Sequence, residues 1–175
     1  MDRKKYEFTG ETRKLSPTRI LYRIRAVIDI PSADVNAGDI GGWIESDSNL
    51  SHSGNAWVGG NALVDGDAWV GSNAWVDGDA RVGDDARVGG NAWVDGDARI
   101  NSNKDFIIIG PIGSRSDFTT FYKNKNENIC VRCGCFSGTV DEFLAAVQKT
   151  HGDNRFGREY RIAAELAKAH ILEED

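Results

Sequence analysis

A six-residue phrase repeats without interruption from Asn55 to Ser102 and constrains the fold of this chain more than any other feature. Its second residue is always Ala, its fourth is Val or Ile, and the residue between them is Trp, Arg or Leu. This alternation is typical of a short strand whose small and branched residues face inward. The other three positions hold Gly, Asp, Asn or Ser, which tolerate turn and left-handed conformations. Each unit therefore predicts one short strand followed by one corner.

Eight such units follow one another, and three strands with three corners close a triangular coil of eighteen residues. Each strand is expected to pair with the strand one coil above it, which makes a parallel β-helix. A β-propeller is the alternative all-β repeat fold, but its repeats are several times longer. We therefore expect a mainly β protein with three parts, namely an N-terminal β cap in residues 1–42, a β-helix in residues 43–105 and a small α+β domain in residues 106–175.

The segment before the repeats predicts a β hairpin. Residues 5–9 and 19–30 have strand patterns, and in the longer one alternate residues are apolar and share one face. These residues are Ile20, Tyr22, Ile24, Ala26, Ile28 and Ile30. Because the end of a coil exposes unpaired strand edges and an open core, a cap is physically required there.

The segment after the repeats predicts three strands covered by two helices. The strands are expected in residues 106–110, 117–123 and 128–136. A capping box at Thr139 predicts the start of the first helix, and apolar spacing predicts the second from about Phe156 to Leu172. This pattern is that of a small α+β domain.

Outward residues eighteen apart are expected to stand above one another, at about the 4.8 Å spacing of neighbouring strands. The three columns are Trp57, Trp75 and Trp93; Leu63, Arg81 and Arg99; and Trp69 and Arg87.

A ladder of three outward indoles is a large apolar strip, and soluble monomers seldom leave such strips uncovered. A second copy of the coil, the C-terminal segment of the chain or a foreign protein could cover it. Trp and Arg are also frequent hot spots of protein interfaces. We therefore expect the partner-binding or oligomer-interface residues to be Trp57, Trp69, Trp75, Trp93, Arg81, Arg87 and Arg99.

The charge of the repeats disfavours nucleic acid as a partner. Residues 55–102 contain eight Asp and three Arg, a net charge of −5 within a chain whose net charge is −6. Such a surface does not attract phosphate groups, although it could attract a basic partner or act as a nucleic-acid decoy. No apolar run suggests a membrane span or a secretory signal, and we expect a cytoplasmic location.

The C-terminal part contains one candidate ligand site. The loop at residues 110–116 is rich in glycine and includes Ser114 and Arg115, a composition that can hold an anion, although it also suits an ordinary strand connection. Any small-molecule site is therefore expected where these two residues lie beside Cys133 and Cys135. Strand alternation does not bring three thiolates together, so we expect neither a metal nor another cofactor.

In a shifted phase the repeat reads Val64-Asp65-Gly66-Asp67-Ala68-Trp69, which resembles the hexapeptide pattern of the left-handed β-helix superfamily. The resemblance implies a left-handed coil, and many members of the superfamily are acyltransferases with a general-base His and an inserted loop. Residues 55–102 contain neither His nor an insertion. His52 is the one candidate base on the coil, and we interpret it as structural. We therefore expect no catalytic residue and a non-enzymatic role.

Segments such as KYEFTGET, LYRIRA, AGDIGGWIE and GCFSGTVDEF also resemble hexapeptide-repeat proteins of bacteriophages and prophages. That resemblance implies a location in the host cytoplasm. We expect a homo-oligomeric scaffold, a dimer or a trimer, that binds a host protein or complex and inhibits a bacterial defence system. Two alternatives remain open, an acyltransferase-like enzyme with a site between subunits and a structural component of the virion.

Overall fold

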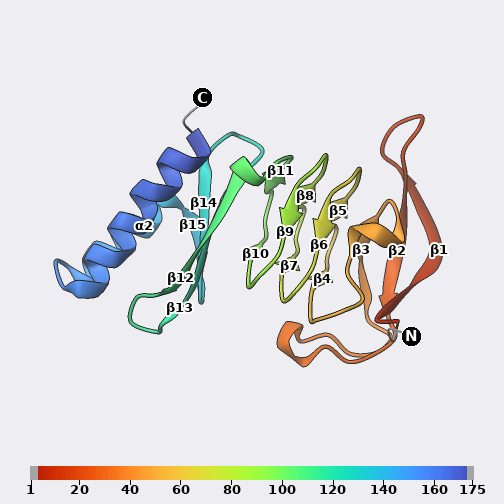
Figure 1. Cartoon of the computed structure of the whole chain (residues 1–175), viewed down its shortest axis with the longest axis horizontal. Helices are drawn as coiled ribbons and strands as arrows, with labels where there is room; N and C mark the ends of the chain where they lie inside the picture. The colour runs from red at the N-terminus through yellow and green to blue at the C-terminus, as the bar shows by residue number, and fades with distance from the viewer. Residues whose placement is uncertain (1–3, 173–175) are drawn as a thin grey trace.

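The computed structural model describes residues 4–172 and has the repeats in its middle, with the two other segments at opposite ends (Figure 1). The repeats form a β-solenoid of about three coils with parallel strands, as the sequence predicted. Its strands are two residues long and comprise β4 (Trp57–Val58), β5 (Leu63–Val64), β6 (Trp69–Val70), β7 (Trp75–Val76), β8 (Arg81–Val82), β9 (Arg87–Val88), β10 (Trp93–Val94) and β11 (Arg99–Ile100).

Main-chain hydrogen bonds connect each strand to the strand eighteen residues further along. Trp57 N donates to Ala74 O at 3.0 Å, and Trp75 N donates to Ala92 O at 2.8 Å. The Ala and Val side chains on either side of each outward residue are almost fully buried and form a continuous core along the coil. The corners contain many residues with positive φ, including Gly60 at +53° and Gly78 at +68°. These observations explain why the repeat combines a small residue, a branched residue and a flexible corner.

The N-terminal strands extend one sheet of the coil. Strands β1 (Tyr6–Lys14) and β2 (Ile20–Ala26) pair antiparallel, and β2 pairs antiparallel with β3 (Ile40–Ile44). Strand β3 is parallel to β5, with Trp43 opposite Leu63. Two 3-10 helices, η1 (Pro31–Ala33) and η2 (Asp47–Asn49), lie in the connections on either side of β3.

The single apolar face predicted for residues 19–30 was wrong in part. Ile20 and Tyr22 are exposed, whereas Leu21 and Ile24 are fully buried. The pairing of β2 with β3 shifts register between Arg23 and Arg25, and this irregularity moves the first half of the strand onto the other face.

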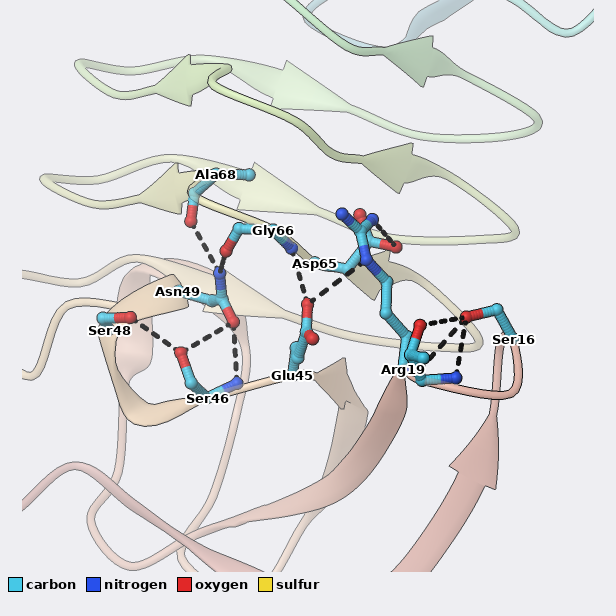
Figure 2. Close-up of polar contacts among 10 residues, drawn as sticks. Ser16, Arg19, Glu45, Ser46, Ser48, Asn49, Asp65, Gly66 and Ala68 are labelled. Atoms are coloured by element: carbon cyan, nitrogen blue, oxygen red, sulfur yellow. Dashed lines mark hydrogen bonds and ion pairs between the residues drawn. The ribbon is translucent and has the colours of Figure 1, made fainter.

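Side chains of residues just before the repeats bind the main chain of the coil (Figure 2). The buried Asn49 Nδ2 donates to Gly66 O at 3.0 Å and to Ala68 O at 2.8 Å, and Glu45 accepts from Gly66 N at 2.7 Å. These bonds satisfy main-chain groups that have no strand partner on this side of the coil.

The C-terminal segment forms a four-stranded antiparallel sheet and two helices. Its elements are η3 (Asn103–Asp105), β12 (Phe106–Ile112), β13 (Asp117–Lys123), β14 (Ile129–Cys133), β15 (Phe136–Thr139), α1 (Val140–His151) and α2 (Arg155–Leu172). The helices pack against the sheet around a core that includes Phe121, Val131 and Phe143.

Both predicted helices are present, and the capping box at Thr139 is confirmed, with Thr139 Oγ1 accepting from Glu142 N at 3.3 Å. The single strand predicted over residues 128–136 was wrong. The chain turns back at Gly134, whose φ is +55°, so that β14 and β15 pair with each other and the sheet has a fourth strand.

The C-terminal sheet packs against the last coil. Tyr122 Oη donates to Asp95 Oδ1 at 2.6 Å, and Trp93 N donates to Thr120 Oγ1 at 3.0 Å. Phe106 and Tyr122 are part of the coil core. The sheet therefore supplies hydrogen-bond acceptors and apolar surface to the end of the solenoid. Within residues 4–172, no helix has the length and hydrophobicity needed to cross a membrane.

Candidate functional site

The outward residues of the coil form the expected columns. Strand pairing places Trp75 between Trp57 and Trp93, and Arg81 between Leu63 and Arg99. Trp69 is paired with Arg87. The structure therefore confirms the vertical alignment that the eighteen-residue period predicted.

The tryptophan column is not a uniformly exposed strip. Trp57 is only 2 % exposed and belongs to the coil core, so its side chain offers almost no surface to a partner in the folded chain. The ring lies close to Gly41 of β3, where an added Cβ would come within 2.6 Å of Trp57 Cζ2. A non-repetitive segment before the coil therefore covers the first indole.

The other end of the column is covered by the C-terminal sheet. Trp75 and Trp93 are half-buried and stack in parallel, with ring centroids 4.9 Å apart and an interplanar angle of 7°. The guanidinium of Arg132 on β14 lies 3.6 Å from the centroid of the Trp93 ring, and Arg132 Nε is 3.5 Å from Asp95 Oδ2. This is a cation–π contact with a carboxylate counter-ion.

A cavity of about 330 Å³ lies beside the middle of the column. It opens between the coil and residues 33–40, and Trp57, Ile40, Trp75 and three aspartates are among its lining residues. The aspartates are Asp34, Asp39 and Asp77. This part of the column therefore combines an aromatic ring with negative charge, under the partial cover of residues 33–40.

The two guanidinium groups of the arginine column differ in their exposure and contacts. Arg81 is exposed, whereas Arg99 Nη1 donates to the main-chain carbonyls of Ala98 at 2.6 Å, Asp79 at 3.0 Å and Asp97 at 3.2 Å. Both arginines line a cavity of about 320 Å³ together with Arg19. Arg99 is therefore held in place by the coil, and Arg81 remains available to a partner.

Carboxylates balance the positive charge of that cavity. Arg19 Nη1 lies 3.3 Å from Asp65 Oδ2, and Arg19 also approaches Glu45 (Figure 2). Burial raises the pKa of Asp65, and the repulsion of Glu45 and Asp84 adds to the increase, while Arg19 opposes it. The cavity is thus a mixed ionic groove and not a simple anion site.

In the third column, the ring of Trp69 packs against two glycines. A Cβ on Gly71 would overlap the Trp69 ring, and one on Gly89 would come within 3.3 Å of it. Trp69 is half-buried in consequence, whereas Arg87 is exposed. Arg87 and Arg81 are therefore the most accessible of the seven residues expected at an interface.

The four residues of the predicted ligand site line one cavity in the C-terminal part. Ser114, Arg115, Cys133 and Cys135 surround a space of about 290 Å³, of which Tyr160 and several apolar side chains form other walls. Cys133 Sγ accepts from Thr119 Oγ1 at 3.3 Å and is 3.9 Å from Tyr160 Oη. Burial, with a contribution from Cys133, raises the pKa of Tyr160 to about 12. The cavity can accommodate a small molecule with an apolar body and a polar head.

His52 has no ring nitrogen free to act as a base. Its Nδ1 accepts from Lys5 N at 3.1 Å, its Nε2 lies 3.1 Å from Asp47 Oδ1, and its ring stacks on Tyr6 with centroids 4.3 Å apart. The geometry therefore gives His52 a structural role in joining β1 to the coil.

Sequence reasoning missed three residues around the columns and in the C-terminal cavity. Arg132 and Tyr160 lie in non-repetitive segments, and no local pattern indicates what they contact. Asp77 had a signal, because it follows Trp75 by two residues just as Asp95 follows Trp93. Within residues 4–172, no group of three or more His, Cys, Asp or Glu residues could hold a metal ion.

Comparison with known proteins does not place the chain in a family. No protein-family model matches it, and no curated protein matches its sequence.

Proposed function

We propose that this protein is a non-enzymatic β-helix scaffold that binds another protein through the outer columns of its coil. One observation carries the proposal. The chain covers Trp57 with its N-terminal segment and Trp93 with Arg132, whereas beside Trp75 an acidic cavity opens between the coil and residues 33–40. Half-buried aromatic rings next to charged groups are typical of interface hot spots. Arg81 and Arg87 add exposed guanidinium groups on the neighbouring columns.

The fold supports a finer assignment that we also propose. The repeat pattern of residues 64–69 favours a left-handed coil of the hexapeptide type. The antiparallel strands β1 and β2, within residues 1–42, act as a β cap, which is supported by the pairing of β2 with β3 and of β3 with β5 of the coil.

The biological setting rests on the sequence resemblance alone. We propose a bacteriophage or prophage protein that acts in the host cytoplasm, where it engages a host protein and inhibits a defence system. The acidic coil supports a basic protein surface as its target and disfavours direct contact with nucleic acid.

The test begins with capture of binding proteins from infected host cells and continues with the purified partner. We expect Arg81→Ala combined with Arg87→Ala to weaken binding at least about tenfold, since desolvated arginines contribute strongly to interfaces. Arg155→Ala combined with Arg158→Ala changes the charge equally at exposed positions of α2 and serves as the control. Equal affinity of the two double variants would contradict binding through the two columns that contain Arg81 and Arg87.

Self-association is a separate part of the proposal. Light scattering during size-exclusion chromatography should give the mass of a dimer or a trimer for the wild-type chain. Because Arg81 and Arg87 are the exposed column residues, their replacement by Glu should reduce that mass if either of their two columns joins the copies. A monomeric wild-type chain would remove self-association from the proposal.

A second candidate function is favoured by the cavity that brings together Ser114, Arg115, Cys133 and Cys135. In that case the C-terminal part binds a small molecule, and an acyltransferase-like reaction is the alternative to a scaffold. Thermal unfolding with coenzyme A, acyl-coenzyme A or nucleotides tests it. A rise in Tm that Arg115→Ala abolishes would support this candidate, and an unchanged Tm at millimolar ligand would count against it.

A further inference from the structure

The stack of Trp75 on Trp93 has two outer faces, and the chain covers one of them with a cation. The Arg132 guanidinium lies on the outer face of Trp93 at 3.6 Å, and Asp95 stands beside it. The molecule therefore already contains one arginine held between an indole face and a carboxylate.

The other outer face belongs to Trp75 and is turned towards Trp57. The strand order β10-β7-β4 requires this direction, because Trp93 occupies the opposite side of the Trp75 ring. Among residues 4–172, neither an aromatic ring nor a cation stacks on this second face. The cavity of about 330 Å³ lies on this side, between Trp57 and Trp75.

A carboxylate stands on the same side as this second face. Asp77 holds the position in its coil that Asp95 holds in the next, two residues after the tryptophan. The carboxylate of Asp77 lies close to the preceding coil, since a Cβ added to Gly60 would be 2.5 Å from Asp77 Oδ1. In the part of the chain that the structure covers, no cation pairs with Asp77 or with Asp34, which lines the same cavity.

We propose that this cavity receives an arginine side chain of a protein partner, with its guanidinium on Trp75 and its charge balanced by Asp77 and Asp34. The inference rests on the proposed protein-binding function and names the chemistry of that site. A guanidinium is planar, weakly hydrated and able to stack on an indole while donating to carboxylates, which a lysine ammonium does less well. An arginine in the cavity would thus stack on Trp75 as Arg132 stacks on Trp93 at the other end of the indole pair.

The direct test uses N-acetyl-arginine amide as the probe and the uncharged N-acetyl-citrulline amide as its isosteric control. In protein labelled with ¹⁵N-tryptophan, the indole signal of Trp75 is identified by its loss in Trp75→Phe. We expect the arginine compound to shift this signal saturably, with a Kd on the order of millimolar, and the citrulline compound to leave it unchanged. Equal shifts with both compounds, or a shift confined to Trp93, would overturn the inference.

The variant Asp77→Asn removes the charge and keeps the shape of the side chain. It should weaken the effect of the arginine compound at least about fivefold. Asp85→Asn changes the net charge equally at an exposed corner outside this cavity and should leave the effect intact. If both variants behave like the wild type, Asp77 is not part of an arginine site.

The same variants separate this inference from the proposed function. If a purified partner binds Asp77→Asn as tightly as the wild type, the protein is a binding scaffold but the arginine site is refuted. If the arginine compound binds and no partner protein is found, the arginine site is supported but the proposed protein-binding function is refuted. If Asp77→Asn splits a dimer of this chain, the arginine comes from a second copy, and a foreign arginine is ruled out.

Discussion

Two buried polar side chains near the start of the coil have opposite effects on stability, because one has hydrogen-bond partners and the other has none. Asn49 is fully buried and donates to two carbonyl groups of the coil. Lys5 is also fully buried, but within residues 4–172 its Nζ has no hydrogen-bond partner. A satisfied buried amide stabilises the fold, whereas an unpaired buried ammonium destabilises it.

We expect Asn49→Ala to lower the free energy of unfolding by about 2–4 kcal/mol, since it leaves the carbonyls of Gly66 and Ala68 without a donor. Urea denaturation followed by tryptophan fluorescence measures the loss. Asn55→Ala is the control, because the Asn55 amide donates to Asn73 on an exposed corner at 3.1 Å and should cost less than about 1 kcal/mol. Equal losses in the two variants would show that the buried bonds of Asn49 contribute no more than exposed ones.

The replacement Lys5→Met should stabilise the protein by about 1–3 kcal/mol at pH 7. Burial lowers the pKa of Lys5 from 10.5 to about 8, so the unfolded chain binds more protons than the folded chain between these values. Stability of the wild type should therefore rise with pH from about 8 to 10.5, and the variant should lack the part of this rise that comes from Lys5.

Denaturation curves at several pH values test this prediction. Lys149→Met, at an exposed position of α1, should change stability by less than about 0.5 kcal/mol and keep the pH dependence. A destabilised Lys5→Met would mean that the ammonium is better solvated in the folded chain than its burial implies.

At the scale of elements, the repeats were predictable and the contacts between segments were not. The coil length, the strand positions and the alignment of the columns all follow from the six-residue repeat, since each coil packs against a coil of nearly the same sequence. Trp57 stands in the same Asn-Ala-Trp-Val phrase as Trp75 but is buried, because a segment before the coil covers it. No periodicity indicates such a contact.

The candidate ligand site shows the same limit. The loop composition and the spacing of Cys133 and Cys135 were enough to name four residues that share one cavity. The strand break at Gly134 was missed, because alternation continues through residues 128–136 and only a positive φ shows the turn. Tyr160 joins the cavity from α2, a helix whose docking depends on the whole C-terminal core.

Packing at the start of α2 should override helix propensity at Gly157. An added Cβ there would overlap Gly152 O, in the turn between the two helices. We therefore expect Gly157→Ala to cost about 1–3 kcal/mol, although Ala favours a helix by about 1 kcal/mol relative to Gly. Ala169→Gly, on an exposed part of the same helix, isolates the propensity effect at about 1 kcal/mol. Chemical denaturation of the two variants would contradict this account if Gly157→Ala were more stable than the wild type.

At the scale of the whole molecule, both ends of the coil are joined to sheets that do not repeat. Thr120 of the C-terminal sheet accepts a hydrogen bond from Trp93 N, and Lys125 N, in the turn between β13 and β14, donates to Asp97 O at 3.0 Å. The sheet also buries Phe106 and Tyr122 against the coil core. These contacts protect strand edges that would otherwise be free to pair with other chains.

A chain that ends at Asp105 should therefore associate. Without the C-terminal sheet, strands β9, β10 and β11 expose main-chain groups and the apolar end of the core. Light scattering should show a mass that increases with concentration, while the full-length chain at the same concentrations keeps a constant mass. A shortened chain whose mass stays constant with concentration and that keeps its β circular dichroism would show that the last coil needs no cover.

The coil sets the distance between the two sheets in steps. Each coil uses eighteen residues and pairs with the next at about the 4.8 Å spacing of neighbouring strands. Gain or loss of one coil would thus lengthen or shorten the molecule by one fixed increment while preserving the contacts at both ends. The distance between the C-terminal sheet and the Trp75 cavity, at which a partner binds, would therefore change by whole coils. Duplication or deletion of a single eighteen-residue stretch in evolution would be enough to change it.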